Sequence, residues 1–171
     1  MTGDLSEAPT TLRALVITSS NRASAGVYED RSGPVLVQGM EALGFAVDGP
    51  VVVPDGEPVG DALRQAVSDG YDVVLTTGGT GLAPGDLTPE VTRPVLDREV
   101  SGLAEAIRAH GVANGVPTAS LSRGLAGVAA ATLVVNLPGS TGGCRDGLTV
   151  LGPVLVHAVS QVRGGDHLRE V

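Results

Sequence analysis

Residues 72–90 restrict the fold of this chain more than any other part of the sequence. Residues 72–75 (DVVL) are a short apolar run typical of a buried strand, and residues 88–90 (TPE) are typical of the start of a helix. A glycine-rich segment, TTGGTGLAPGD, joins them at residues 76–86. A strand that leads through a glycine-rich turn into a helix indicates an α/β protein.

The glycine-rich segment also has the composition of a phosphate-binding loop. Glycine lets the backbone approach a ligand closely, and successive N–H groups then form a concavity for anions. The residues that would form this cradle are Thr77, Gly78, Gly79, Thr80 and Gly81. Asp86 would repel bare phosphate, but a carboxylate can hold Mg²⁺ against phosphate oxygens. The segment alone also fits a plain strand-to-helix turn in which Asp86 interacts favourably with the helix start.

The absence of lysine narrows the chemistry. All 11 basic residues are arginine, which excludes both a Walker-A loop and a Schiff-base lysine. The segment does not fit the dinucleotide pattern GxGxxG either. A nucleotide site in this chain must therefore use backbone amides, hydroxyls, arginine or a metal ion.

Length and composition predict a single cytoplasmic domain. The 171 residues suit one domain, which we place at residues 11–164 between a disordered tail (1–10) and a short polar tail (165–171). A net charge of −8 and 2% aromatic residues argue against nucleic acid as a partner. The first ten residues lack an apolar signal core, and no apolar run is long enough to span a membrane.

Apolar runs and helical periodicity alternate along the chain. We predict strands at residues 12–18, 45–53, 72–76 and 132–136, a short extended segment at 118–122, and helices at 33–43, 57–69, 88–98, 102–110 and 147–163. Such alternation predicts an α/β three-layer sandwich, with a mostly parallel central sheet and helices on both faces.

Four loops follow predicted strands and are expected to meet at one edge of the sheet. They are residues 19–30, 54–56, 77–87 and 137–143, the last being a second glycine-rich loop. Ligands of such sheets bind beyond the carboxyl ends of the strands. This edge is therefore the predicted site.

Five segments in order resemble one known family. They are residues 19–30 (SSNRASAGVYED), 53–55 (VPD), 76–90, 117–123 (PTASLSR) and 136–140 (NLPGS). Through them the chain resembles molybdenum cofactor biosynthesis proteins of the MogA/MoaB type, which include the G domain of gephyrin. The resemblance covers about residues 12–160.

The resemblance implies a molybdopterin adenylyltransferase. Active members use ATP and Mg²⁺ to transfer AMP to the terminal phosphate of molybdopterin, and they release pyrophosphate. It also implies an α/β sandwich around a mainly parallel sheet, a homotrimer, and hand-over of the product to a molybdenum insertase of the MoeA type.

The resemblance also implies roles for individual residues. Asp55 and Asp86 match two acidic residues used in catalysis through Mg²⁺. The substrate and nucleotide positions match Ser19, Thr77, Gly78, Gly79, Thr80, Gly81, Ser122, Asn136, Pro138, Gly139 and Ser140. Arg22 lies in the matching first loop, and Arg123 and Arg145 are candidate site cations whose alternative is a solvated surface charge. Cys144 is interpreted as a structural cysteine at a helix start.

Two departures from the family pattern leave a second function open. Many catalytic relatives have arginine where this chain has Gly85, and some have lysines where it has Thr141, Gly142 and Gly143. Both changes remove positive charge near the predicted site. The alternatives are therefore a non-catalytic molybdopterin-binding or scaffolding protein of the same pathway, as in the MoaB branch, or an unrelated nucleotide-phosphate enzyme on the same fold.

Overall fold

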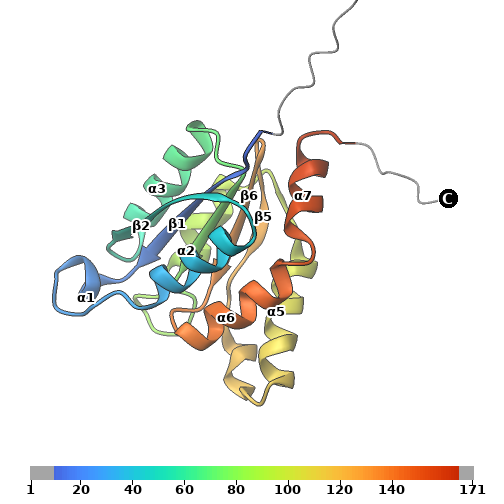
Figure 1. Ribbon diagram of the computed structural model, residues 1–171. Coiled ribbons are helices and arrows are strands. Elements are labelled where there is room, and N and C mark those ends of the chain that lie inside the picture. The colour runs from blue at the N-terminus through green and yellow to red at the C-terminus, as the bar shows by residue number, and fades with distance from the viewer. Residues whose placement is uncertain (1–9, 166–171) are drawn as a thin grey trace, which may run out of the picture.

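The computed structural model describes residues 10–165, so the predicted tails lie almost entirely outside the described residues. Its strands are β1 (Arg13–Ser19), β2 (Ala46–Val53), β3 (Val73–Thr77), β4 (Arg98–Glu99), β5 (Ala126–Ala129) and β6 (Thr132–Leu137). Its α-helices are α1 (Asn21–Ser24), α2 (Ser32–Ala42), α3 (Glu57–Ser68), α4 (Thr88–Thr92), α5 (Ser101–Ala113), α6 (Thr141–Leu151) and α7 (Leu155–Val162). Two 3₁₀ helices, η1 (Arg93–Val95) and η2 (Pro117–Leu121), complete the elements (Figure 1).

The strands form one sheet in the order β2-β1-β3-β6-β5-β4. The pairs β1–β2, β1–β3 and β3–β6 are parallel, whereas β4–β5 and β5–β6 are antiparallel. The chain passes from β1 to β2 on one side and then to β3 on the other side of β1. The carboxyl ends of β1 and β3 therefore flank a topological switch point, where open α/β sheets bind ligands.

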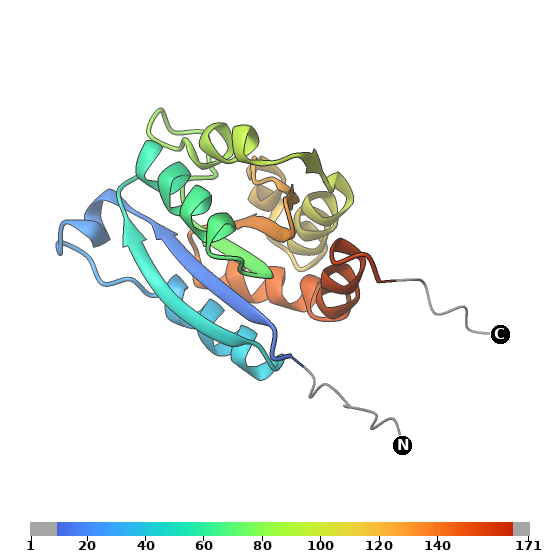
Figure 2. The ribbon, with the colours of Figure 1, turned by 90° about the horizontal axis from the view of Figure 1, so that it is seen from above.

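Helices cover both faces of the sheet, which confirms the predicted α/β class. Alternate residues of β1 point to opposite faces, because side chains of a strand alternate. Ala14 and Val16 pack with α2, α5, α6 and α7, whereas Leu15 and Ile17 pack with α3. Figure 2 shows α3 and α2 on opposite sides of the sheet.

The elements nearest the predicted site follow from local sequence. In α3, Val59, Leu63 and Ala66 recur at helical spacing and are buried on one face. β3 and β6 are buried along their whole length, and most of their residues are apolar, as is typical of central strands covered on both faces. These two strands end directly at the two glycine-rich segments.

The antiparallel end of the sheet was not predicted. β5 and β6 are joined by the two-residue turn Ala130-Ala131, which carries none of the usual hairpin residues. Ala130 has a positive φ of 50°, and its N–H donates to Asp97 Oδ2 at 2.6 Å. A long-range hydrogen bond thus supports a turn that local sequence does not reveal.

Several predicted boundaries were wrong. The predicted helix 147–163 is two helices, α6 and α7, separated at Pro153, and α6 already begins at Thr141 inside the predicted second loop. In place of the predicted helix 88–98, the chain forms the short α4, then η1, which contains Pro94, and then β4. Residues 118–122 were predicted to be extended but largely form η2, where the Ser120 hydroxyl donates to the carbonyl of Pro117 at 2.7 Å.

Within residues 10–165, no helix is both long enough and apolar enough to span a membrane.

Candidate functional site

The first glycine-rich loop (residues 78–87) starts at the switch point, in close contact with the end of β1. Gly78 has a φ of +95°, and a Cβ there would lie 2.3 Å from the carbonyl oxygen of Ser19. Gly79 has a φ of +68°, and a Cβ there would lie 2.3 Å from Thr88 Oγ1. Only glycine fits both the backbone conformation and the space at these positions.

Thr88, the first residue of α4, holds this loop from the far side. Its hydroxyl donates to the carbonyl of Gly78 at 3.0 Å, and its N–H donates to the carbonyl of Gly79 at 3.0 Å. Thr88 is completely buried. The cradle of backbone amides is thus fixed by a side chain ten residues along the chain.

The second glycine-rich segment (residues 138–143) lies against the first. A Cβ on Gly139 would be 3.3 Å from the Cα of Gly78, so the two backbones are nearly in contact. Ser140 is the N-cap of α6, and its hydroxyl accepts the N–H of Gly143 at 3.0 Å. The first turn of a helix presents free N–H groups and favours anions.

Asp55 approaches the same edge from the end of β2. The Ser19 hydroxyl donates to Asp55 Oδ1 at 2.5 Å, and the Asp55 N–H donates to Asn21 Oδ1 at 3.0 Å. A Cβ on Gly56 would lie 3.7 Å from Leu87 Cδ1, so the turn after Asp55 packs against the first glycine-rich loop. The loops after β1, β2 and β3 therefore meet, as predicted.

Asp86 closes a tight turn within the first loop. Its Oδ2 accepts the N–H of Ala83 at 3.1 Å, and its own N–H donates to the carbonyl of Ala83 at 2.9 Å. A Cβ on Gly81 would lie 2.7 Å from the same carboxylate oxygen. The side chain is therefore folded back over its own loop.

The carboxylate oxygens of Asp55 and Asp86 are suitable ligands for Mg²⁺. Among residues 10–165, one oxygen of each carboxylate accepts a hydrogen bond and the other has no protein donor. Mg²⁺ prefers one or two carboxylates together with water and substrate phosphates. The same part of the chain contains no group of three or more His, Cys, Asp or Glu side chains placed to hold a metal.

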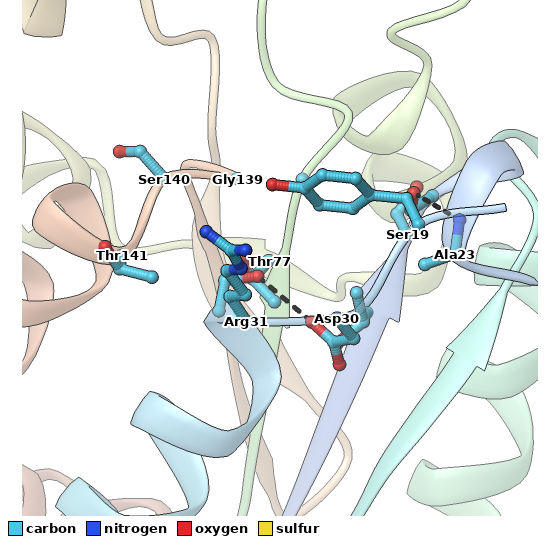
Figure 3. A pocket seen from close by; sticks show the side chains of 13 residues that line it. Ser19, Ala23, Asp30, Arg31, Thr77, Gly139, Ser140 and Thr141 are labelled. Carbon is cyan, nitrogen blue, oxygen red and sulfur yellow. Dashed lines mark hydrogen bonds between the residues drawn. The ribbon is translucent and has the colours of Figure 1, made fainter. Parts of the chain in front are cut away.

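Two cavities open beside the glycine-rich loops. The smaller has a volume of about 310 Å³ and lies between the loop after β1 and the start of α6. Its lining includes Ser19, Tyr28, Asp30, Arg31, Thr77, Gly78, Gly139, Ser140 and Thr141. In Figure 3, Arg31 lies between Ser19 on one side and Ser140 and Thr141 on the other.

The walls of the smaller cavity are charged and held by hydrogen bonds. Asp30 accepts the Thr18 hydroxyl at 2.8 Å and the N–H of Gly33 at 3.0 Å, so it is held at the start of α2. The guanidinium carbon of Arg31 lies 5.9 Å from the centre of the Tyr28 ring, within cation–π range. The cavity thus offers a cation, a carboxylate and an aromatic ring.

The larger cavity has a volume of about 750 Å³ and a more apolar wall. Its apolar side is formed by Val116, Ala119 and Leu121. Its polar lining includes Gly79, Thr80, Gly81, Asp86, Asn114, Ser122, Arg145 and Asp146. Apolar side chains with a few convergent polar groups are typical of a small-molecule site.

Gly78, Gly139 and Ser140 line both cavities. We call these three residues the shared ridge. Ligands in the two cavities would meet over it, where backbone amides and the start of α6 favour anions.

Two predicted site residues do not line either cavity. Asp55 reaches the site through Ser19. Asn136 is buried, where its Nδ2 donates to Thr76 Oγ1 at 3.0 Å and to Thr92 Oγ1 at 3.1 Å, and its Oδ1 accepts the N–H of Leu125. Asn136 therefore ties β6 to β3, to α4 and to the segment before β5.

The candidate cations are placed differently from one another. Arg145 lines the larger cavity, whereas the guanidinium of Arg123 is bonded to the first glycine-rich loop and to Glu90. Arg22 is exposed and lies 5.4 Å from the Tyr28 ring centre. Arg31 was not predicted, although a basic residue at a helix start just after a strand-end loop is a signal that could have identified it.

A polar cluster on α5 and α6 was also not predicted. The Asn114 amide donates to Asp146 Oδ1 at 3.2 Å and lies 2.9 Å from His110 Nε2. Asn114 and Asp146 line the larger cavity. Asn114 and Asp146 are 32 residues apart, so no local sequence pattern indicates that they meet.

Cys144 has the structural role that was predicted for it. The side chain is completely buried in α6, and Thr77 Oγ1 lies 3.3 Å from its sulfur. Burial raises the pKa of the Cys144 thiol to about 11. A thiol that stays protonated at neutral pH is a poor nucleophile.

A family described as a probable molybdopterin binding domain matches residues 15–157. The solved structure of the molybdopterin biosynthesis Mog protein from Mycobacterium ulcerans superposes with a TM-score of 0.86 at 49% identity, covering 91% of this chain and 99% of that one.

Curated sequences agree with this match. A molybdopterin adenylyltransferase of Pyrococcus furiosus is 35% identical over 161 residues, covering 92% of this chain and 95% of that protein. A molybdenum cofactor biosynthesis bifunctional protein of Chlorobaculum tepidum is 36% identical over 157 residues, and the match spans half of its length (50%). This chain belongs to the molybdopterin-binding family of molybdenum cofactor biosynthesis, which confirms the resemblance inferred from its loops.

Proposed function

We propose that this protein is a molybdopterin adenylyltransferase that transfers AMP from ATP to the terminal phosphate of molybdopterin and releases pyrophosphate. The observation that carries the proposal is the shared ridge of Gly78, Gly139 and Ser140 between the two cavities. The reaction requires two anionic substrates with their phosphates side by side. Two cavities that adjoin at the shared ridge, where backbone amides favour anions, satisfy that requirement. Proximity and charge neutralisation then supply most of the rate enhancement.

The charges on the site support attack of one phosphate on another. Arg31 lines the smaller cavity and Arg145 the larger, so each cavity offers a cation for an anionic ligand. The glycine amides and the start of α6 add partial positive charge at the ridge. The site needs no covalent nucleophile.

Asp55 and Asp86 would hold Mg²⁺ through their remaining carboxylate oxygens. The ion, when bound, would neutralise charge on the phosphates of ATP. In this proposal the Ser19 hydroxyl orients Asp55 and the Ala83 N–H orients Asp86.

A non-catalytic molybdopterin-binding protein is the second candidate. It is favoured by Gly85 and by the segment Thr141-Gly142-Gly143, which lack the positive side chains of many relatives. The structure weighs against it, because Arg31 and Arg145 place other cations at the cavities.

The remaining expectations follow from the family. We propose a cytoplasmic homotrimer that passes its adenylated product to a MoeA-type insertase. Light scattering of the purified protein tests the trimer, and co-purification with such an insertase tests the hand-over.

The decisive experiment is an adenylation assay with the purified chain, molybdopterin, ATP and Mg²⁺, in which adenylated molybdopterin is separated by chromatography. We expect product with the natural chain and a loss of about 10²- to 10³-fold in kcat with Asp86→Asn. The variant lacks one carboxylate ligand of the proposed Mg²⁺, so less of the charge on the phosphates would be neutralised in the transition state. Molybdopterin binding, followed by fluorescence titration, should survive in the variant.

Asp61→Asn is the matched control. Asp61 is an exposed carboxylate on α3 that pairs with Arg64, away from both cavities. This variant should keep full activity. Molybdopterin binding without product in the natural chain would establish the second candidate, and undiminished turnover in Asp86→Asn would refute the role of that residue.

A further inference from the structure

Arg123 directs its whole guanidinium group at the first glycine-rich loop. Its Nε donates to the carbonyl of Gly81 at 2.9 Å, its Nη2 donates to the carbonyl of Asp86 at 2.6 Å, and its Nη1 bonds to Glu90 Oε1. Its own backbone N–H donates to the carbonyl of Thr80 at 2.8 Å. One residue thus contacts the loop before, at and after the aspartate.

The loop has few other restraints between these contacts. Residues 82–85 are exposed, and the side chain of Leu82 is 65% exposed. Within the turn, the Asp86 carboxylate accepts the N–H of Ala83, and the Asp86 N–H donates to the Ala83 carbonyl. Without Arg123, the carbonyls of Gly81 and Asp86 would lose their side-chain donors. The position of the Asp86 carboxylate therefore depends on Arg123.

The backbone around Arg123 is itself held by hydrogen bonds. Arg108, on α5, donates to the carbonyls of Ser122 and Gly124 at 3.3 and 3.1 Å, which fixes the backbone on both sides of Arg123. The Ser122 hydroxyl donates to Thr80 Oγ1 at 3.3 Å. The segment 122–124 is therefore a fixed base from which Arg123 reaches the loop.

We propose that Arg123 is a positioning residue for the adenylyl transfer. Its guanidinium clamps the first glycine-rich loop so that the Asp86 carboxylate stays at the larger cavity. Arg123 lines neither cavity, so it acts through Asp86 and not on substrate. The catalytic part of this inference rests on the proposed function.

The clamp requires the guanidinium geometry. Its donors must reach three acceptors spread over residues 81–90, and a planar fork of N–H groups can do so. A lysine ammonium is a compact point charge that cannot hold the same acceptors together. Arg123→Lys should therefore behave like Arg123→Ala and not like the natural chain.

The test combines kinetics with chemical rescue. In Arg123→Ala we expect kcat for adenylation to fall about 10- to 100-fold, because small displacements of catalytic groups are costly, while KM changes little. Guanidinium chloride at low, non-denaturing concentration should restore part of kcat, and sodium chloride of equal ionic strength should not. Arg93→Ala is the control, because Arg93 makes an exposed ion pair with Glu99.

Hydrogen exchange of the loop amides gives a second readout that needs no activity. Exchange of residues 81–90 should increase in Arg123→Ala and fall again with guanidinium, while residues 138–145 stay unchanged. An unchanged kcat, or a reduced kcat that guanidinium does not restore, would overturn the proposal. If the natural chain makes no product, the proposed function fails separately, and unchanged exchange of residues 81–90 would then overturn the clamp as well.

Discussion

The two glycine-rich segments meet at Gly78 and Gly139 but are held in different ways. The first glycine-rich loop depends on distant side chains, namely Thr88 from α4 and Arg123 from the segment after η2. The second segment continues directly into α6, and its cap bond runs from Gly143 to Ser140, only three residues apart, while the Thr77 hydroxyl donates to the Pro138 carbonyl at its start at 2.7 Å.

This difference separates two ways of building an anion site. A helix start supplies oriented N–H groups through local backbone geometry alone. A free-standing loop needs long-range contacts to keep its amides in place, and these contacts also position the carboxylate of Asp86. We therefore expect substitutions in the first loop to cost more stability than substitutions in the second segment.

The largest effect is expected for Gly78→Ala. Gly78 has a φ of +95°, and a Cβ there would lie 2.3 Å from the Ser19 carbonyl oxygen. The backbone at the end of β1 or of β3 would therefore have to move. We expect the free energy of unfolding to fall by about 3 kcal/mol or more, measured by urea denaturation. Gly85→Ala, an open position in the same loop, should change it by less than about 0.5 kcal/mol. Equal effects of the two variants would contradict the tight contact at Gly78.

Thr88→Val should have the next largest effect. The change keeps the shape of the side chain but leaves the Gly78 carbonyl without its buried donor. We expect a loss of about 1 to 3 kcal/mol in urea denaturation. Thr149→Val provides the comparison, because Thr149 is exposed and its hydroxyl donates to the Arg145 carbonyl within α6. A Thr88 variant as stable as the Thr149 variant would argue against side-chain support of the first loop.

Ser140→Ala tests the local support of the second segment. It removes the cap acceptor for the N–H of Gly143, and loss of such a cap costs about 1 kcal/mol. Ser140→Gly should cost only a few tenths of that, since glycine is tolerated at this position. Thermal melting of both variants in parallel measures the difference, and a loss for Ser140→Ala as large as for Gly78→Ala would contradict the comparison.

Gly142→Ala should have the smallest effect and the opposite sign. The position lies in the first turn of α6, and a Cβ there would meet no atom within 4 Å. Alanine restricts the unfolded chain and suits a helix, so we expect a gain of about 0.5 kcal/mol. A destabilised variant in the same melting experiment would show that the second segment is as tightly constrained as the first.

Local sequence predicted the central elements because their signals lie within a few residues. The helix predicted at 57–69 is α3, whose apolar residues recur at helical spacing. β1, β3 and β6 are apolar runs that end close to the predicted boundaries. The meeting of the strand-end loops then followed from the topology of a parallel sheet.

Contacts between distant residues decided what the sequence pattern missed. The β5–β6 turn at Ala130 is supported by Asp97, thirty-three residues away. The amide of Asn136, a site residue implied by the resemblance, donates to the hydroxyls of two buried threonines. Arg123, for which the sequence left open a site cation or a solvated surface charge, directs its donors at the loop. A side chain's partner depends on where the folded backbone places it, which no local spacing encodes.

The sequence by itself therefore determined the fold class, the family and the order of the loops. The fold class and the order of the loops followed from apolar runs that end in glycine-rich turns, and the family followed from the resemblance of five segments. Only the tertiary structure decided that two cavities share Gly78, Gly139 and Ser140, and that Arg123 faces the loop and not a cavity. These features arise where elements from distant parts of the chain pack together, so the physical reason lies in packing and not in local sequence.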